Sequence, residues 1–522
     1  MSYLESAIPQ DGKHTYSLKT SWRGLNLKNT IDSGELSFAK NISMTELPYL
    51  RTAPLPDGES SPNALAKTFA YIGQNPGGAD QYCCAYISSG VFYAAVYTVG
   101  STVPSVYSIN TTSFWPPASP ANEDIRIVPF NRYSDFGDSN TQNIVSSTYT
   151  RYVLFYPMNV SLNIDAVSPS LTVFSFKNST GSQTWASNLC PVLDNIAVHQ
   201  GRVWGTHEGK LYASKWNQYE SWTLPTASDI EEGKDVSSWA WVSETQSDIM
   251  AAEDFTAIVS YDSHIVAFKK HFMHQVYNTK NPFRIVDIAK VGCVSQNALC
   301  VCNRILFFVA EDGVYSYTGS YPEKISEKLN ITSCSDDCVL GCDDRTVYFW
   351  DGTKVYTYDT ENGCWSSVDV TGTPLRMEHI GHHCFVLTET VSGGTTTHNV
   401  AVFGRGDTYG TFEIQTDMIW RGTINENRIL KLRLYVSKLE DGVQDWIKLY
   451  VSTSVKNEGW QLKKVLYTSA AGDTVISVTP RLLADFGHSF RIEGTGSWII
   501  RYFYEEFLDA DRQNRTTGIT TI

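Results

Sequence analysis

The chain has 522 residues and a formal net charge of −14, with 42% hydrophobic and only 18% charged residues. The hydrophobic content excludes an intrinsically disordered chain, and the length is enough for more than one domain. The acidic balance excludes a protein that grips nucleic-acid phosphates with clustered Lys and Arg. It is compatible with passage of DNA without specific binding, because like charges repel.

Aromatic residues make up 13% of the chain, including 29 Tyr and 14 Trp. This composition favours sheets over helices and predicts an all-β fold class. The opening residues are polar and lack the apolar core of a signal peptide, and no run approaches the ~20 apolar residues of a membrane span. We therefore expect a protein that folds in a cytosol without a membrane span, with its 11 Cys as reduced thiols.

Residues 1–62 are predicted to form an extended N-terminal arm. Apolar anchors such as Trp22 and Leu36 are separated by turn residues, and the segment ends among Pro54 and Pro62. This pattern is typical of a segment laid over other surfaces and not of a compact unit.

Residues 63–415 contain seven hairpin-like units. Their turns fall near residues 90, 162, 208, 262, 312, 352 and 392. Beyond the longer first gap the spacing is roughly 40–54 residues, which is the length of one four-stranded propeller blade. A single hairpin buries too little surface to be stable alone, whereas closure into a ring stacks neighbouring sheets. We therefore predict a β-propeller of six to eight blades, with seven favoured.

The hairpin of residues 196–222 shows the repeat most clearly. A tight Glu-Gly turn joins its strands, and Arg202 opens the strand before the turn. Arg304 and Arg345 open the corresponding strands of two later hairpins. The three Arg side chains are predicted to bind carbonyl or carboxylate groups between strands. His207 does not recur, so we interpret it as an exposed loop residue and not as a catalytic one.

Residues 416–510 alternate apolar with charged positions, as in Arg428–Val436 and Trp498–Phe507. Strands with one buried and one wet face are typical of antiparallel sheets, and we predict a separate β-sandwich here. Residues 511–522 are polar and are predicted to form a flexible C-terminal tail.

Three short clusters contain metal-ligand residue types. They are Cys293, Cys300 and Cys302; Cys334, Cys338 and Cys342; and His379, His382, His383 and Cys384. The first lies in an apolar strand pattern, and the spacing of the second is loose for zinc. The third precedes a strand, where neighbours point to opposite faces. The sequence therefore predicts no metal site and no cofactor.

Carboxylate pairs are candidates for hydrolytic chemistry. They are Glu253 and Asp254, Glu311 and Asp312, Asp336 and Asp337, and Asp343 and Asp344. A glycosidase needs two carboxylates that converge across a sugar, whereas these pairs fall at turns, where Asp and Glu bond locally. The sequence has no nucleophile elbow, P-loop or dinucleotide fingerprint. We predict no catalytic residues and a protein that is not an enzyme, with a propeller hydrolase as an alternative.

Several short segments resemble virion proteins of tailed bacteriophages. Trp22–Asn26, Gly34–Leu36 and Asn41–Ser43 resemble the opening of tail-nozzle (tail tubular protein B-like) proteins, and residues 201–222 resemble their propeller repeat. The resemblance implies a non-enzymatic structural protein of the virion, made in the host cytoplasm. It implies a part of a ring or tube at the tail or head-tail junction. The implied partners are adaptor, portal or tail proteins and copies of the chain itself.

In such a ring the arm is expected to bridge neighbouring subunits. Deletion of residues 1–50 is expected to leave the propeller folded but to abolish assembly into particles. The alternative function is a propeller binding module that recognises a host surface glycan or protein. The aromatic segments Phe114–Trp115 and Trp239–Trp241 motivate this alternative.

Overall fold

The computed structural model describes most of the chain. The described residues are 4–6, 14–19, 22–28, 34–110, 122, 125–133, 149–157, 170–176, 183–243, 253–277, 280–281, 283–417, 419–420, 427–453, 459–480, 482–484 and 487–509. They form 42 β-strands, one short α-helix, α1 (Ala227–Glu231), and one 3-10 helix, η4 (Glu327–Leu329). The predicted all-β fold class is confirmed. No helix in these ranges is long and apolar enough to cross a membrane.

Seven four-stranded antiparallel sheets follow one another along the chain. The first three comprise β7 (Thr68–Gln74), β8 (Asp80–Ser88), β9 (Val91–Thr98) and β10 (Ser105–Asn110); β11 (Ile125–Tyr133), β12 (Tyr149–Pro157), β13 (Ser170–Phe176) and β14 (Gln183–Leu189); and β15 (Asn195–His199), β16 (Arg202–His207), β17 (Lys210–Ala213) and β18 (Trp241–Val242).

The remaining four sheets reach Val402, and the last of them takes its fourth strand from the N-terminal region. They comprise β19 (Phe255–Tyr261), β20 (His264–Lys269), β21 (Met273–Tyr277) and β22 (Arg284–Ala289); β23 (Leu299–Cys302), β24 (Ile305–Ala310), β25 (Gly313–Tyr317) and β26 (Glu323–Lys324); β27 (Val339–Cys342), β28 (Thr346–Trp350), β29 (Val355–Asp359) and β30 (Cys364–Val368); and β31 (Thr373–Ile380), β32 (His383–Ser392), β33 (Thr395–Val402) and β6 (Asp57–Ser60).

The seven predicted hairpins correspond to strand pairs in these sheets. The pairs are β8–β9, β12–β13, β16–β17, β19–β20, β24–β25, β28–β29 and β32–β33. At three of the turns Ser89, Glu208 and Asp262 adopt positive φ angles of 50°, 45° and 47°. The turn between β12 and β13 lies outside the described residues. Alternation and turn residues therefore located the hairpins correctly.

The first strands of most successive sheets lie beside one another. Strand β7 contacts both β11 and β31, so the first and seventh sheets are neighbours in space. Between the first and second sheets, the rings of Phe92 and Phe155 are 4.9 Å apart. Between the first and seventh sheets, the rings of Tyr82 and Phe385 are 5.7 Å apart. Burial of apolar faces between stacked sheets stabilises this arrangement.

Residues 1–62 contribute strands to three different sheets. Before β6 they form β1 (Leu4–Ser6), β2 (His14–Lys19), β3 (Leu36–Lys40), β4 (Ile42–Ser43) and β5 (Leu50–Thr52). Strand β6 pairs with β33, with Ser60 opposite Val400. The segment that we expected to lie over other surfaces is instead hydrogen-bonded into sheets of its own chain. Free strand edges offer unpaired N–H and C=O groups, and the arm satisfies them.

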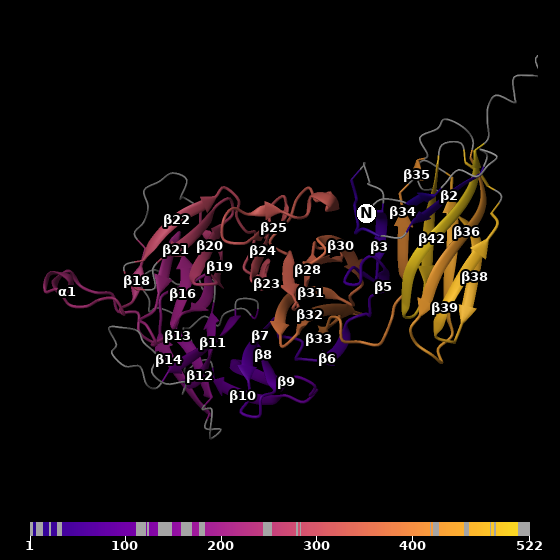
Figure 1. Ribbon diagram of the computed structural model, residues 1–522. Helices are drawn as coiled ribbons and strands as arrows, with labels where there is room; N and C mark the ends of the chain where they lie inside the picture. Colours follow the sequence, from indigo (N-terminus) through magenta and orange to yellow (C-terminus); the bar gives the residue numbers. More distant parts are fainter. Residues whose placement is uncertain are drawn as a thin grey trace, which may run out of the picture.

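Two larger sheets pack face to face at one end of the molecule (Figure 1). One has the order β1-β2-β42-β36-β39 with β4, β5 and β40 attached, and the other has the order β3-β34-β41-β37-β38 with β35 attached. Their remaining strands are β34 (Phe412–Thr416), β35 (Ile419–Trp420), β36 (Asn427–Lys438), β37 (Asp445–Ser452), β38 (Gln461–Thr468), β39 (Gly472–Val478), β40 (Leu482–Ala484), β41 (Gly487–Gly494) and β42 (Trp498–Asp509). We call this pair of sheets the two-sheet module. Its C-terminal part begins with β34 at Phe412, whereas residue 416 was predicted. The module also includes the N-terminal strands β1 to β5.

The arm also joins the two-sheet module to the sixth four-stranded sheet. The Leu25 amide donates to the Trp365 carbonyl over 2.7 Å, and the Ser367 hydroxyl donates to the Ala39 carbonyl over 2.7 Å. The Asn41 amide donates to the carbonyl of Ser367 over 2.8 Å. We call this contact the seam. One apolar core runs through it, from the fourth, fifth and sixth sheets into the two-sheet module.

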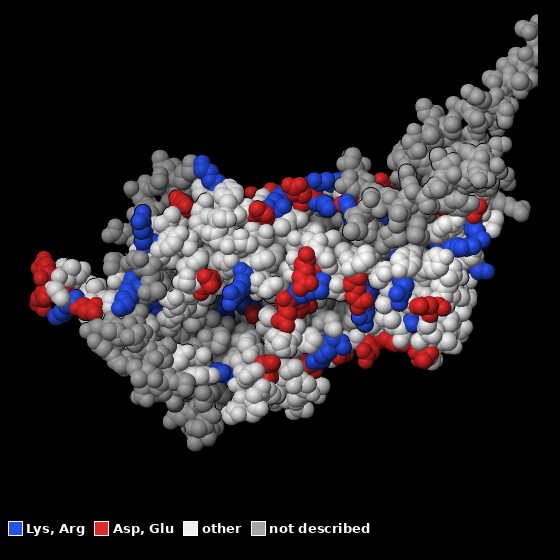
Figure 2. All heavy atoms as spheres, in the orientation of Figure 1, with Lys and Arg blue, Asp and Glu red and all other residues white. Residues whose placement is uncertain are grey.

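Acidic and basic side chains are interspersed over the face shown in Figure 2, without a broad basic area among the described residues of that face. Exposed ion pairs such as Lys40 with Asp369 (2.8 Å) and Lys28 with Glu327 (3.4 Å) follow the seam. Exposed pairs of this kind contribute about 0–1 kcal/mol each, so the apolar core and the backbone hydrogen bonds hold the seam.

Candidate functional site

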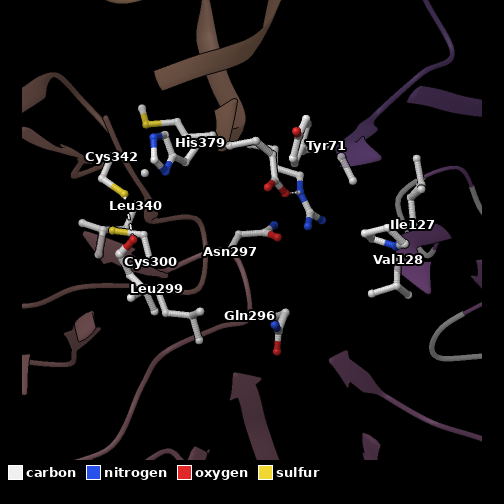
Figure 3. A pocket seen from close by; sticks show the side chains of 17 residues that line it. Tyr71, Ile127, Val128, Gln296, Asn297, Leu299, Cys300, Leu340, Cys342 and His379 are labelled. Atoms are coloured by element: carbon white, nitrogen blue, oxygen red, sulfur yellow. Dashed lines mark hydrogen bonds and ion pairs between the residues drawn. The ribbon is translucent and has the colours of Figure 1, made fainter. Parts of the chain in front are cut away.

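A cavity of about 350 Å³ lies among the first strands of five of the seven sheets (Figure 3). Its walls come from β7, β11, β23, β27 and β31 and from the segment that precedes β23. A volume of this size is at the lower end of small-molecule sites. The cavity is therefore the candidate site that the fold itself defines.

Charged groups of the cavity are paired with one another or with its walls. The Arg376 Nε donates to Glu378 Oε1 over 2.8 Å, and both residues belong to β31. Tyr71 donates its hydroxyl hydrogen to Asp80 over 2.7 Å. Burial, followed by this hydrogen bond, raises the pKa of Tyr71 to about 12, so its phenol is neutral at ordinary pH.

One segment beside the cavity connects four sheets. Asn297 Oδ1 accepts a hydrogen bond from Arg126 Nη1 (2.9 Å) in β11, and the Asn297 carbonyl accepts from the Leu340 amide (2.9 Å) in β27. Gln296 binds both the amide and the carbonyl of Ile258 in β19, over 2.8 and 2.9 Å. Because Arg126 and Asn297 are 171 positions apart in sequence, this polar link depends on the arrangement of whole sheets.

Three cavity residues, Cys300, Cys342 and His379, belong to the clusters named from the sequence, whereas Arg376 and Glu378 were not among the candidates. Arg376 and Glu378 are two positions apart on one strand and therefore point to the same side. Their ion pair could therefore have been predicted from this spacing in the sequence. The arrangement presents an amide, a phenol and an internal ion pair in a half-enclosed space. It can hold water or a small polar molecule.

The first two cysteine clusters meet between the fifth and sixth four-stranded sheets, where Cys342 hydrogen-bonds with Cys300 and Cys302. All eleven thiols are free. Cys302 Sγ donates to the Asp343 carbonyl and Cys342 Sγ donates to the Val301 carbonyl, each over 3.3 Å. Burial raises the pKa of Cys293 to about 12, so this thiol is protonated at ordinary pH. No group of three or more His, Cys, Asp or Glu residues in the described ranges is arranged to hold a metal ion.

Two members of the histidine cluster lie beside a carboxylate from a distant part of the sequence. His379 Nε2 and His382 Nδ1 lie 3.1 and 2.7 Å from the carboxylate of Asp344, on the loop after β27. The hydrogen bond from His382 lowers the pKa of Asp344. Cys384 is buried in β32, away from this surface group. Sequence spacing could not predict this grouping, because β27 and β31 belong to different sheets.

The carboxylate pairs form both local and long-range contacts. Asp343 accepts from the amides of Arg345 and Thr346, over 2.8 and 2.6 Å, as expected of a turn residue. Glu253 and Glu311 come together on either side of His271, at 2.6 and 3.2 Å. These two hydrogen bonds raise the pKa of His271, and the Glu253 bond is the larger cause. The grouping is an exposed ion cluster.

Two of the three repeated Arg side chains bind as predicted. Arg202 donates to the carbonyls of Ser214 (2.6 Å) and Ser237 (2.8 Å). Arg345 binds Asp359 over 2.6 and 3.2 Å. For Arg304 the described contact is different, since its carbonyl accepts a hydrogen bond from a tyrosine hydroxyl.

His207 was expected to be an exposed loop residue. It is instead the last residue of β16, and its Nδ1 lies 3.0 Å from the carboxylate of Asp194. Trp241 packs against Trp204 and Phe283, with ring centroids 6.1 and 5.3 Å away, so its ring serves the core between sheets. Phe114 and Trp115 lie outside the described residues.

Comparisons with known proteins identify no family. No family model matches the chain, and no curated protein matches it. Among solved structures, AztD from Citrobacter koseri is 13% identical with a TM-score of 0.30, over 59% of this chain and 88% of AztD. The extracellular domain of BT4673 from B. thetaiotaomicron is 8% identical with a TM-score of 0.28, over 94% of this chain and 79% of that domain. Similarity at this level assigns neither family nor function.

Proposed function

We propose that the seven four-stranded sheets close into a seven-bladed β-propeller and that the two-sheet module is a β-sandwich. The contact of β7 with β31 supports closure, because it joins the first sheet to the last. The cavity lined by five first strands fits the axial channel of such a ring. Strand β6 completes the last sheet with residues from the start of the chain.

We further propose that the protein is a non-enzymatic structural component of a tailed-phage virion, in a ring or tube at the tail or head-tail junction. The observation that carries this proposal is the seam. The arm segments that resemble tail-nozzle proteins, including Trp22 and Leu25, are buried between the propeller and the sandwich. Through these segments the two modules share one apolar core. A rigid two-module subunit of this kind suits a structural component of a virion. The net charge of −14 suits passage of DNA without binding.

Electron microscopy of the purified protein tests this proposal. Rings or tubes of uniform diameter are expected over a series of rising protein concentrations, since a structural subunit assembles by mass action. Particles that stay monomeric throughout the series would contradict the proposed function. A density map with a gap between the first and seventh sheets would contradict the closed propeller.

A second candidate function is a binding module. The size and polar lining of the cavity suit a small polar ligand better than a surface glycan. The Trp241 ring packs in the core, so it is not offered by a binding loop. A glycan array checks the surface alternative directly, and binding of an oligosaccharide there would favour it over assembly.

A further inference from the structure

The connection between β17 and β18 projects from the third sheet at the end of the molecule opposite the two-sheet module (Figure 1). We call residues 223–236 the finger. Its helix α1 begins with a capping box, in which Thr226 and Asp229 bind each other's backbone amides, and no residue of this helix is buried. Arg202 anchors the base through the carbonyls of Ser237 and Trp239. The finger is thus an ordered projection without an apolar core.

The exposed side chains of the finger are acidic and apolar. Ile230 and Leu224 expose 61% and 45% of their surfaces. Four acidic residues and one Lys lie between residues 223 and 236. In Figure 2 the acidic atoms gather at the tip of this projection. These exposed apolar residues add nothing to a core of the finger, so they are available to contact a partner.

The outer face of β37 and β38 has complementary properties. By register, Trp446 lies opposite Tyr467 and Tyr450 lies opposite Leu462. The alternate residues of β37, Ile447 and Leu449, are buried on the other side of the strand. Tyr467 and Leu462 are 59% and 50% exposed. The Lys448 ammonium lies 3.9 Å from the ring centroid of Trp446. Tyr and Trp side chains are enriched where proteins bind each other, and Lys448 adds a positive charge beside them. We call this surface the aromatic face.

The edge of β38 itself is protected against strand addition. Lys464 lies opposite the buried Leu449, so its charge is on the side that faces the sandwich interior. Charged residues at such positions on edge strands prevent pairing with another strand. A partner is therefore expected to bind through the outer side chains of the aromatic face and not through the backbone edge.

We propose that the finger of one copy of this chain docks on the aromatic face of the next copy. The finger supplies Ile230 and acidic groups, and the aromatic face supplies rings and Lys448. The two surfaces lie at opposite ends of the molecule, with α1 at the left and β38 at the right of Figure 1. A head-to-tail contact of this kind generates a ring when the rotation closes. The inference rests on the proposed assembly and specifies the interface that forms it.

Charge reversal in full-length protein tests the contact. One variant carries Glu231→Lys and Glu232→Lys, the second carries Lys448→Glu, and a third combines all three substitutions. Sedimentation velocity and electron microscopy measure assembly. Each of the first two variants is expected to assemble about tenfold more weakly, because like charges then face each other. The combined variant is expected to recover assembly.

Matched controls separate this contact from general effects. Lys464→Glu makes the same charge change on β38 but on its interior side, and it is expected to leave assembly unchanged. Ile230→Ser is expected to weaken assembly without altering the circular dichroism spectrum, because no residue of α1 is buried. Rings that form equally well from every variant, or a combined variant that stays monomeric, would overturn the interface while leaving the proposed function intact. A wild-type protein that never forms rings would overturn both.

Discussion

Lys19 ends β2 as a buried cationic side chain, with only 8% of its surface exposed. Its ammonium group lies 4.3 Å from the ring centroid of Trp22. Burial lowers the pKa of Lys19 from 10.5 to about 7, since the low-dielectric surroundings disfavour the charged form. A single residue therefore makes the stability of the arm depend on pH.

The substitution Lys19→Met should stabilise the protein most at acidic and neutral pH. Between about pH 7 and 10.5 the unfolded chain holds a proton that the folded chain releases, so the free energy of unfolding rises with pH across this window. Below about pH 7 the whole cost of burying the charged Lys19 side chain lowers the free energy of unfolding, by on the order of 5 kcal/mol at most. Calorimetry at both ends of the window should show a larger gain in melting temperature at the acidic end. An equal gain at both ends would refute the burial argument, and Lys290→Met, at an exposed position, serves as the control.

At the scale of elements, the N-terminal strands have two separate structural tasks. Strands β3, β4 and β5 bury Leu36, Ile42 and Leu50 in the shared core of the seam and the two-sheet module. Strand β6 instead closes the seventh four-stranded sheet by pairing with β33. A deletion can separate these tasks because they lie in consecutive parts of the arm.

Deletion of residues 1–50 should leave the seventh sheet intact and expose the core of the two-sheet module. Hydrogen exchange is expected to stay slow at Val400–Val402 and to become fast in β36 and β42. Deletion of residues 1–62 also removes β6, so exchange at Val400–Val402 should become fast as well. Fast exchange at these residues in the shorter deletion would show that β6 alone does not hold the sheet closed.

At the scale of the whole molecule, the seam makes the sheets and the two-sheet module one cooperative body. Gly24 lies where the arm crosses β30, and a Cβ atom there would be 2.8 Å from the backbone nitrogen of Trp365. The backbones at Gly24 and Trp365 cannot move apart without separating the two modules. The close approach thus couples the stability of one module to that of the other.

The substitution Gly24→Ala should lower the free energy of unfolding by about 1–3 kcal/mol, the usual cost of overpacking. It should also split one calorimetric transition into two, because the modules are then less tightly coupled. Gly58→Ala in β6 is the matched control, since a Cβ atom there meets nothing within 4 Å. If both variants melt alike, close packing at the seam does not govern cooperativity.

The amino-acid sequence by itself determined the local structure. Alternating apolar residues and a turn such as Glu208-Gly209 specify a hairpin because both signals act between residues close in the chain. The same reasoning predicted the interstrand role of Arg202, which binds a carbonyl only 12 positions away.

Only the tertiary structure decided which distant groups meet. The pairing of Ser60 with Val400 joins distant parts of the chain within one sheet. The link from Arg126 to Asn297 and the approach of His379 to Asp344 join different sheets. Alternation shows that a strand has a buried face but not which free edge it will pair with, because every strand edge offers the same N–H and C=O groups. The arm, the cavity and the seam therefore emerge only when all the sheets are packed together.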